Sequence, residues 1–218
     1  MTKFDFETIE NFDEHINLSI PDYSSMVEQV VNFSSFFIKP NSAYYDIGCS
    51  TGSLLTKINL KNINTGFRAI GIDKSRHLTD CHPDTFICDF ETDLDGFEFD
   101  ENTTFITVIF TLQFLSYETK VKLLEKIHDS LKVGGGVIIC EKIFLNDGFF
   151  QDLFTFTHYD YKLKSFSEKE IMQKQFDLRY IMRPVSEREN LQLFSDAGFH
   201  KVESFWQSLN FKGWVLIK

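Results

Sequence analysis

The sequence lacks the features that mark membrane-spanning and secreted proteins. No apolar run in its 218 residues approaches the roughly 18 residues of a membrane span, and acidic residues interrupt the first twenty positions, so we expect neither a span nor a signal peptide. There are only four cysteines, and without a secretory signal we interpret them as free thiols in a reducing compartment. These absences predict a cytoplasmic protein.

Positive charge is also scarce. The chain has 22 basic and 32 acidic residues, a net charge of -10. Unspecific affinity for a phosphate backbone comes from clustered lysine and arginine, so we expect no direct binding of nucleic acid. The hydrophobic fraction of 43% and the charged fraction of 25% are typical of a globular protein with one substantial core.

Strand-like and helix-like segments alternate through the middle of the chain. The β-prone runs are 43–48, 67–73, 84–90, 104–110 and 136–144, and helical apolar spacing follows the first run and again covers 117–131. This alternation predicts a mostly parallel sheet covered on both faces, a doubly wound Rossmann-like α/β fold. The span between the second and third runs is too short for a full helix.

The remaining segments are predicted to be helices and a closing hairpin. Residues 1–42 form an expected N-terminal helical cap, and residues 43–218 form the α/β domain. Within that domain, 146–184 has helical periodicity and breaks the alternation, so we expect an insertion above the carboxyl edge of the sheet. A capped helix at 186–199 precedes two strands that form the antiparallel hairpin.

A glycine-bearing turn, Y-D-I-G-C-S-T-G at 45–52, follows the first predicted strand. Glycine lets the backbone approach a ligand closely, and the amino end of the next helix supplies N–H groups and a positive dipole. The turn has neither the G-x-G-x-x-G spacing of a dinucleotide site nor the Lys-Ser/Thr of a phosphate-binding loop. A nucleoside without phosphates therefore fits it better than a nicotinamide dinucleotide or a nucleoside triphosphate.

Two acidic residues stand at the ends of the next two predicted strands. Asp73 could accept hydrogen bonds from ribose hydroxyls, and Asp89 could accept one from the exocyclic amine of a base. Taken singly, each acid is equally well explained as a helix cap, and the glycine turn as a structural turn. Their combination at three successive strand ends favours a nucleoside site.

This arrangement resembles the S-adenosylmethionine site of class I methyltransferases. A more specific resemblance, to the bacterial carboxy-S-adenosylmethionine synthase family, extends in order across nearly the whole chain. It is carried by S-I-P-D-Y-S-S-M at 19–26, Y-D-I-G-C-S at 45–50, F-T-L-Q-F-L at 110–115, G-G-G-V-I-I-C-E-K at 134–142, S-E-K-E-I-M-Q-K at 167–174 and F-W-Q-S-L-N-F at 205–211.

The resemblance implies an enzyme that converts S-adenosylmethionine and prephenate into carboxy-S-adenosylmethionine and phenylpyruvate. The implied mechanism is carboxyl transfer, in which a methyl-deprotonated sulfonium traps carbon dioxide released from prephenate. The product serves a partner enzyme that carboxymethylates wobble uridine in tRNA. The resemblance also implies a homodimer, with S-adenosylmethionine or carboxy-S-adenosylmethionine as the bound cofactor.

The family's cofactor contacts can be carried over residue by residue. Asp46 is added to these contacts because it lies inside the same glycine-turn motif. The expected cofactor-binding residues are Tyr23, Asp46, Gly48, Cys49, Ser50, Asp73 and Asp89, with Lys74 and Phe90 in adjoining backbone positions.

Two positions depart from the family's pattern. The arginine that grips the added carboxylate falls on Gln175, and the asparagine at the end of the fourth strand falls on Ile109. An arginine–carboxylate pair is charge-assisted and roughly twice as strong as a neutral hydrogen bond, so glutamine is a weak replacement. The carboxylate-binding half of the site is where this chain differs most from the family.

A compensating cation is one hypothesis for this difference. If 167–183 is a single helix, Arg179 lies one turn beyond Gln175 on the same face, and Lys174 is adjacent. The alternative is that both cations simply face solvent. Tyr23, Gln175 and Arg179 are the catalytic candidates.

Other functions remain open at this stage. The lost arginine and asparagine favour an ordinary small-molecule methyltransferase, and a non-catalytic cofactor-binding relative is a further alternative. Direct tRNA modification requires that four lysines of the insertion form one basic face, namely Lys162, Lys164, Lys169 and Lys174.

Histidine and cysteine clusters are weaker signals. His77, Cys81, His82 and Cys88 match no metal-binding spacing, and Cys88 falls in a predicted strand, so we expect no metal. The H-Y-D-Y segment at 158–161 could supply a general base or substrate contacts, or could equally pack as part of a lid.

Overall fold

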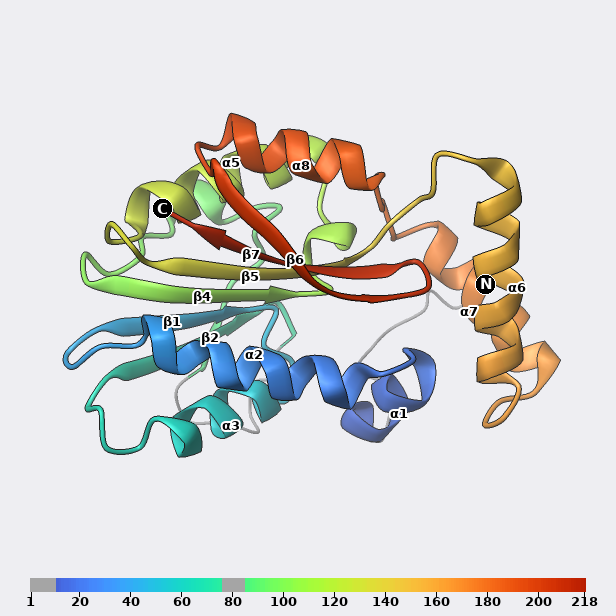
Figure 1. The fold of residues 1–218 in the computed structure, drawn as a ribbon, viewed down its shortest axis with the longest axis horizontal. Coiled ribbons are helices and arrows are strands. Elements are labelled where there is room, and N and C mark those ends of the chain that lie inside the picture. The colour runs from blue at the N-terminus through green and yellow to red at the C-terminus, as the bar shows by residue number, and fades with distance from the viewer. Residues whose placement is uncertain (1–10, 76–84) are drawn as a thin grey trace.

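The computed structural model describes residues 11–75 and 85–218, and a seven-stranded sheet lies at its centre (Figure 1). The strands are β1 Ala43–Ile47, β2 Arg68–Asp73, β3 Thr85–Ile87, β4 Thr103–Ile109, β5 Gly136–Lys142, β6 Lys201–Ser208 and β7 Phe211–Ile217. Their order is β3-β2-β1-β4-β5-β7-β6, in which β1 to β5 pair in parallel and β7 is antiparallel to both neighbours. The predicted mostly parallel sheet with a closing antiparallel strand is confirmed.

Helices cover both faces of this sheet. They are α1 Phe12–Ser19, α2 Tyr23–Phe37, α3 Ser53–Lys61, α5 Tyr117–Ser130, α6 Gly148–Lys162, α7 Glu168–Arg179 and α8 Glu187–Asp196, with short 3-10 turns η2 Leu94–Gly96 and η3 Leu112–Phe114. Figure 1 shows α2 and α3 on one side of the sheet and α5 and α8 on the other, so the sheet is doubly wound. Within the described ranges, no helix combines the length and the apolar character needed to cross a membrane.

The central strand β1 shows how the sequence builds both halves of the core. All five of its residues are buried, because β1 lies between β2 and β4. Tyr45 and Ile47 pack in the cluster that includes α5 and α8, whereas Tyr44 packs in the cluster that includes α2. Side chains alternate along a strand, so Asp46 shares the face of Tyr44. The strand thereby carries a carboxyl group into a largely apolar layer.

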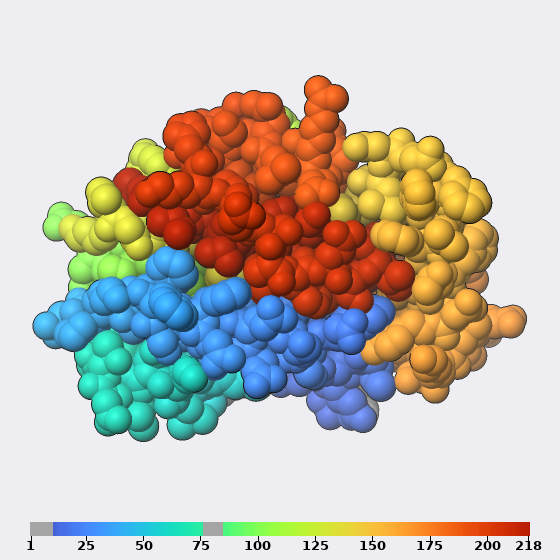
Figure 2. All heavy atoms as spheres, viewed as in Figure 1, coloured from blue at the N-terminus to red at the C-terminus, as the bar shows by residue number. Residues whose placement is uncertain are grey.

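The predicted insertion at 146–184 contains two helices, α6 and α7, beyond the carboxyl ends of the parallel strands (Figure 1). Figure 2 shows this gold-to-orange segment packed against the blue N-terminal helices. The contact includes a hydrogen bond from His158 Nε2 to the carbonyl oxygen of Ser19 at 2.8 Å and one from the Tyr161 hydroxyl to the carbonyl oxygen of Asn17 at 3.0 Å. The insertion therefore covers the sheet edge together with α1.

Two predicted elements are shorter than the sequence suggested. Within its described part, 85–90, the predicted run at 84–90 forms a strand only at β3. The Asp89 N–H donates to Asp93 Oδ2 at 3.1 Å, and the Glu91 N–H donates to Asp89 Oδ1 at 3.1 Å. These side-chain contacts turn the chain, so Asp89 lies just past the strand instead of within it. The supposed helix 167–183 likewise ends at Arg179 as α7.

Candidate functional site

The glycine turn connects β1 to α3 at the carboxyl edge of the sheet. The N–H groups of Gly48 and Cys49 donate to the carbonyl oxygen of Ile72 at 2.7 and 3.0 Å, which fixes the turn beside the end of β2. Gly48 has a φ of +76°, and a Cβ at this position would lie 2.0 Å from Thr111 Oγ1. Only glycine fits here, because a side chain would meet both backbone strain and a steric clash.

Asp73 holds the turn from the end of β2. Its Oδ2 accepts a hydrogen bond from the Ser50 N–H at 2.9 Å, and its Oδ1 accepts one from the Ser75 N–H at 2.9 Å. Each carboxylate oxygen has two acceptor positions, so the group can still accept hydrogen bonds from ribose hydroxyls. The structure thus brings together Gly48, Cys49, Ser50 and Asp73, as the sequence predicts.

An orphaned hydroxyl marks the same turn. Ser50 Oγ is buried and has no hydrogen-bond partner within the described residues. A buried polar atom without a partner is costly, and a polar ligand would satisfy it. Together with the close-packed glycine and the acceptor at Asp73, this hydroxyl fits a nucleoside ligand in the turn.

Asp46 lies below the turn in a polar network within the core. Its Oδ1 accepts a hydrogen bond from Thr107 Oγ1 at 2.7 Å, and Thr107 in turn lies 2.8 Å from the Tyr44 hydroxyl. Burial raises the pKa of Asp46 to about 7, while the Thr107 hydrogen bond lowers it. Burial, followed by the charge of Asp46, also raises the pKa of Tyr23 well above its usual value. Tyr23 therefore remains a neutral phenol near Asp46, at the first turn of α2.

The F-T-L-Q-F-L segment turns the chain across the end of β4. Phe110 adopts a φ of +55°, which starts this turn. The Leu112 N–H donates to Glu141 Oε1 at 3.0 Å, and the Lys142 N–H donates to Gln113 Oε1 at 2.9 Å. The segment is therefore tied to the end of β5 at two points, and it forms part of the same sheet edge as the glycine turn.

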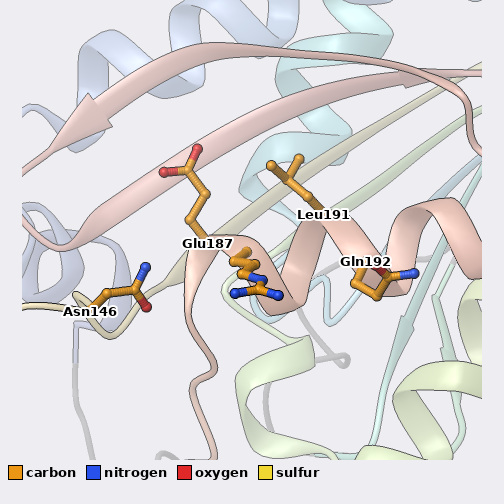
Figure 3. A pocket seen from close by; sticks show the side chains of 5 residues that line it. Asn146, Glu187, Leu191 and Gln192 are labelled. Atoms are coloured by element: carbon orange, nitrogen blue, oxygen red, sulfur yellow. The ribbon is translucent and has the colours of Figure 1, made fainter.

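A surface hollow lies elsewhere, on α8. Figure 3 shows Asn146, Glu187, Leu191 and Gln192 around it, and Arg188 completes its lining. The hollow has a volume of about 460 Å³. None of the residues predicted to bind the cofactor lines it, so the hollow is separate from the glycine turn.

Curated relatives identify the family of this chain. Proteins named carboxy-S-adenosyl-L-methionine synthase from Vibrio campbellii and Vibrio cholerae are each 33% identical to it over 224 residues, covering 99% of this chain and 91% of the relative. The chain belongs to the carboxy-S-adenosyl-L-methionine synthase family. No family model matches the chain. Membership confirms the predicted class, a transferase that uses S-adenosylmethionine as its cofactor.

Solved structures support the fold of this synthase-family chain. A methyltransferase from Archaeoglobus fulgidus, described as S-adenosylmethionine-dependent, has a TM-score of 0.59 at 11% identity and covers 89% of this chain and 94% of its own. Human N-acetylserotonin methyltransferase in complex with S-adenosylmethionine has a TM-score of 0.57 at 16% identity, covering 90% of this chain and 52% of its own. The predicted class I methyltransferase fold is confirmed.

The other residues predicted from the family lie in different settings. Lys74 is exposed at the end of β2, whereas Phe90 is buried and packs edge-on against Phe97, so a cofactor contact at position 90 falls to its backbone. Gln175 is partly buried in α7, and Arg179 is exposed at the end of that helix. Their roles as cofactor contacts and catalytic candidates stay predictions.

Sequence reasoning missed two residues that shape this edge. Thr111 fills the space above Gly48 and donates from Oγ1 to the carbonyl oxygen of Ile47 at 3.0 Å. Glu141 is buried at the end of β5, where burial raises its pKa to about 8. Both belong to quoted family motifs, but their roles depend on contacts between strands that are distant in sequence.

The candidate metal cluster falls mostly outside the described residues. His77, Cys81 and His82 lie in that undescribed part, while Cys88 is a buried free thiol just after β3. The four insertion lysines also do not form one exposed face, because Lys162 is only 3% exposed while Lys164 and Lys169 are exposed. This arrangement removes the feature on which direct tRNA modification depended.

Proposed function

We propose that this protein converts S-adenosylmethionine and prephenate into carboxy-S-adenosylmethionine, with phenylpyruvate and water as the other products. The observation that carries the proposal is the 33% identity, along 99% of the chain, to proteins named carboxy-S-adenosyl-L-methionine synthase. The cofactor supplies the methyl carbon that receives the carboxyl group. The protein has to bind both molecules, orient them and limit access of water.

The described residues divide these tasks. The glycine turn and Asp73 would hold the nucleoside of the cofactor through backbone N–H groups and a carboxylate acceptor. Tyr23 closes the site from α2, with its ring 6.2 Å from that of Phe110. The insertion covers the carboxyl edge together with α1, which supports a role in excluding water.

The test is to incubate purified protein with S-adenosylmethionine and prephenate and to identify the products by mass spectrometry. We expect carboxy-S-adenosylmethionine and phenylpyruvate to form in equal amounts. A heat-denatured sample controls for spontaneous decomposition of prephenate. The proposal would be contradicted if S-adenosylmethionine remained unchanged and prephenate disappeared only at the rate seen in the control.

A small-molecule methyltransferase is the second candidate, because Gln175 and Ile109 replace the family's arginine and asparagine. A methyl group needs no carboxylate receptor, so the loss of these residues would not impair methyl transfer. Transfer of labelled methyl from S-adenosylmethionine to an added acceptor, without carboxy-S-adenosylmethionine, would favour this function.

We also propose that the protein is a cytoplasmic homodimer whose product supplies a tRNA wobble-uridine-modifying enzyme. The support for a dimer is an apolar face on α6, where Phe149, Leu153 and Phe156 are 72%, 46% and 63% exposed. Their spacing of four and three residues places them on one side of the helix. Exposed apolar patches of this kind mark association surfaces.

A further inference from the structure

Three lysines from different elements converge at the sheet edge. Lys142 ends β5, Lys162 ends α6 and Lys174 lies within α7. Burial, and then the charge of Lys142, lowers the pKa of Lys162 to about 8. Burial, and then the charge of Lys162, lowers the pKa of Lys174 to about 7. The Lys162 ammonium group therefore lies within electrostatic reach of both Lys142 and Lys174.

Two histidines line the same place without adding negative charge. His158 Nε2 donates to the carbonyl oxygen of Ser19, and burial followed by the charges of Lys162, Lys142 and Lys174 lowers the pKa of His158 to about 4. His15 forms a hydrogen bond with Lys174 and also has a pKa lowered to about 4, first by burial. Both rings are neutral at pH 7.

The lysines of β5 and α6 lack an anionic partner in the described part of the chain. Neither Lys142 nor Lys162 forms an ion pair there, although Lys162 is only 3% exposed. Lysine is seldom fully buried unless paired, because removing an ammonium group from water is costly. An arriving anion would supply the missing partner.

The position of this cluster relates it to the cofactor turn. Lys142 lies at the carboxyl end of β5, which is next to β4, and β4 is next to β1 and its glycine turn. Helix α1 links the two regions, because Asp13 Oδ1 accepts from Thr51 Oγ1 at 3.0 Å and the Asn17 carbonyl oxygen accepts from the Tyr161 hydroxyl. Ligands of open α/β sheets bind outside this edge.

We propose that Lys142, Lys162 and Lys174 form the receptor for a carboxylate of the second substrate. The inference rests on the proposed function, in which that substrate is the dianion prephenate. Ammonium groups bind a carboxylate through charge-assisted hydrogen bonds, and this cluster provides positive charge that Gln175 does not. Lys142 and Lys174 keep partial exposure, so the cluster is open to a ligand from the sheet edge.

The test measures binding without turnover. Prephenate is titrated calorimetrically into protein saturated with S-adenosylhomocysteine, which has no methyl group to react. We expect Lys162→Met to weaken prephenate binding at least about tenfold, since a charge-assisted hydrogen bond is lost. Lys162→Arg should retain most of the affinity. Lys169→Met, at an exposed position of α7, is the matched control and should bind as the wild type does.

The outcomes separate this inference from the proposed function. The receptor would be overturned if Lys162→Met bound prephenate as tightly as the wild type does, or if the wild type did not bind prephenate. It would also be overturned if Lys162→Met lost affinity for S-adenosylhomocysteine to the same extent as for prephenate. If prephenate binding depends on these lysines but no carboxy-S-adenosylmethionine forms from S-adenosylmethionine, the receptor is supported and the synthase reaction is contradicted. Lys142→Met undergoes the same titration, so the inference remains testable if Lys162→Met does not fold.

Discussion

At the scale of single residues, Gly48 is the position where the glycine turn tolerates no side chain. Gly48→Ala places a Cβ against Thr111 at a φ of +76°, so we expect a loss of about 1–3 kcal/mol in the free energy of unfolding and weaker S-adenosylmethionine binding. Calorimetric titration and thermal melting measure both effects. Gly66→Ala is the matched control, because its φ is +68° and its Cβ would meet nothing within 4 Å. Equal losses of stability and of S-adenosylmethionine affinity in the two variants would contradict the close packing at Gly48.

Asp46 gives a pH dependence whose sign follows from its burial. Burial raises its folded pKa from 3.8 to about 7, so between about pH 4 and pH 7 the folded state binds more protons than the unfolded state. The contribution of Asp46 to stability is therefore present at low pH and is lost as the pH rises through 7. We expect Asp46→Asn to remove this decline in the free energy of unfolding between about pH 4 and pH 7, as measured by urea unfolding.

The comparison for Asp46 is Asp152→Asn, at an exposed position of α6, which should leave the wild-type pH dependence unchanged. Glu141 also has a raised pKa, so the difference between wild type and variant is the informative quantity. If the free energy of unfolding changed with pH in Asp46→Asn as it does in the wild type, this carboxyl group would have a similar pKa in the folded and unfolded states.

At the scale of elements, two helices begin with the same capping box but differ in their packing. Ser167 caps α7 and Ser186 caps α8, each reciprocally with a glutamate three residues later. Helix α7 buries only Ile171, whereas α8 buries Leu193 and Phe194 in the main core. Loss of either cap should lower the stability of its helix by about 1 kcal/mol. The part of the protein that is destabilised should differ between the two variants.

Hydrogen exchange would distinguish these effects. Ser167→Ala should accelerate exchange mainly within α7, because that helix can open without exposing the core. Ser186→Ala should lower the melting temperature of the whole protein. Faster exchange throughout the sheet in Ser167→Ala would show that the insertion is coupled to the core more tightly than its burial indicates.

At the scale of the whole molecule, the exposed face of α6 predicts self-association. The double variant Phe149→Ser/Phe156→Ser removes two side chains that are 72% and 63% exposed, so it should convert a homodimer into a monomer. Light scattering coupled to size-exclusion chromatography measures the mass. Phe36→Ser is the control, because Phe36 is 74% exposed at the end of α2, away from the insertion. A monomeric wild type, or a dimer that survives the double variant, would contradict this prediction.

Much of the fold, and the grouping of the glycine turn with Asp73, could be predicted because their signals are local. Buried strands leave apolar runs, helices leave periodic ones, and a turn with no room for a side chain leaves glycine, as at Gly48. Asp73 lies beside the glycine turn because the carboxyl ends of parallel strands meet at one edge, and its contact with the cofactor stays a prediction. The third strand was predicted too long, because the turn at Asp89 depends on side-chain hydrogen bonds that strand propensity does not describe.

The sequence by itself determined the alternating fold, the glycine turn and the family, since each is recorded in the order and spacing of neighbouring residues. The tertiary structure alone decided which polar groups are removed from water. Lys162 and Lys169 are equally charged and lie on consecutive helices, yet one is buried and the other exposed. Packing of α6 and α7 over the sheet edge makes that difference, because the cost of burying a charge depends on its surroundings and not on its place in the chain.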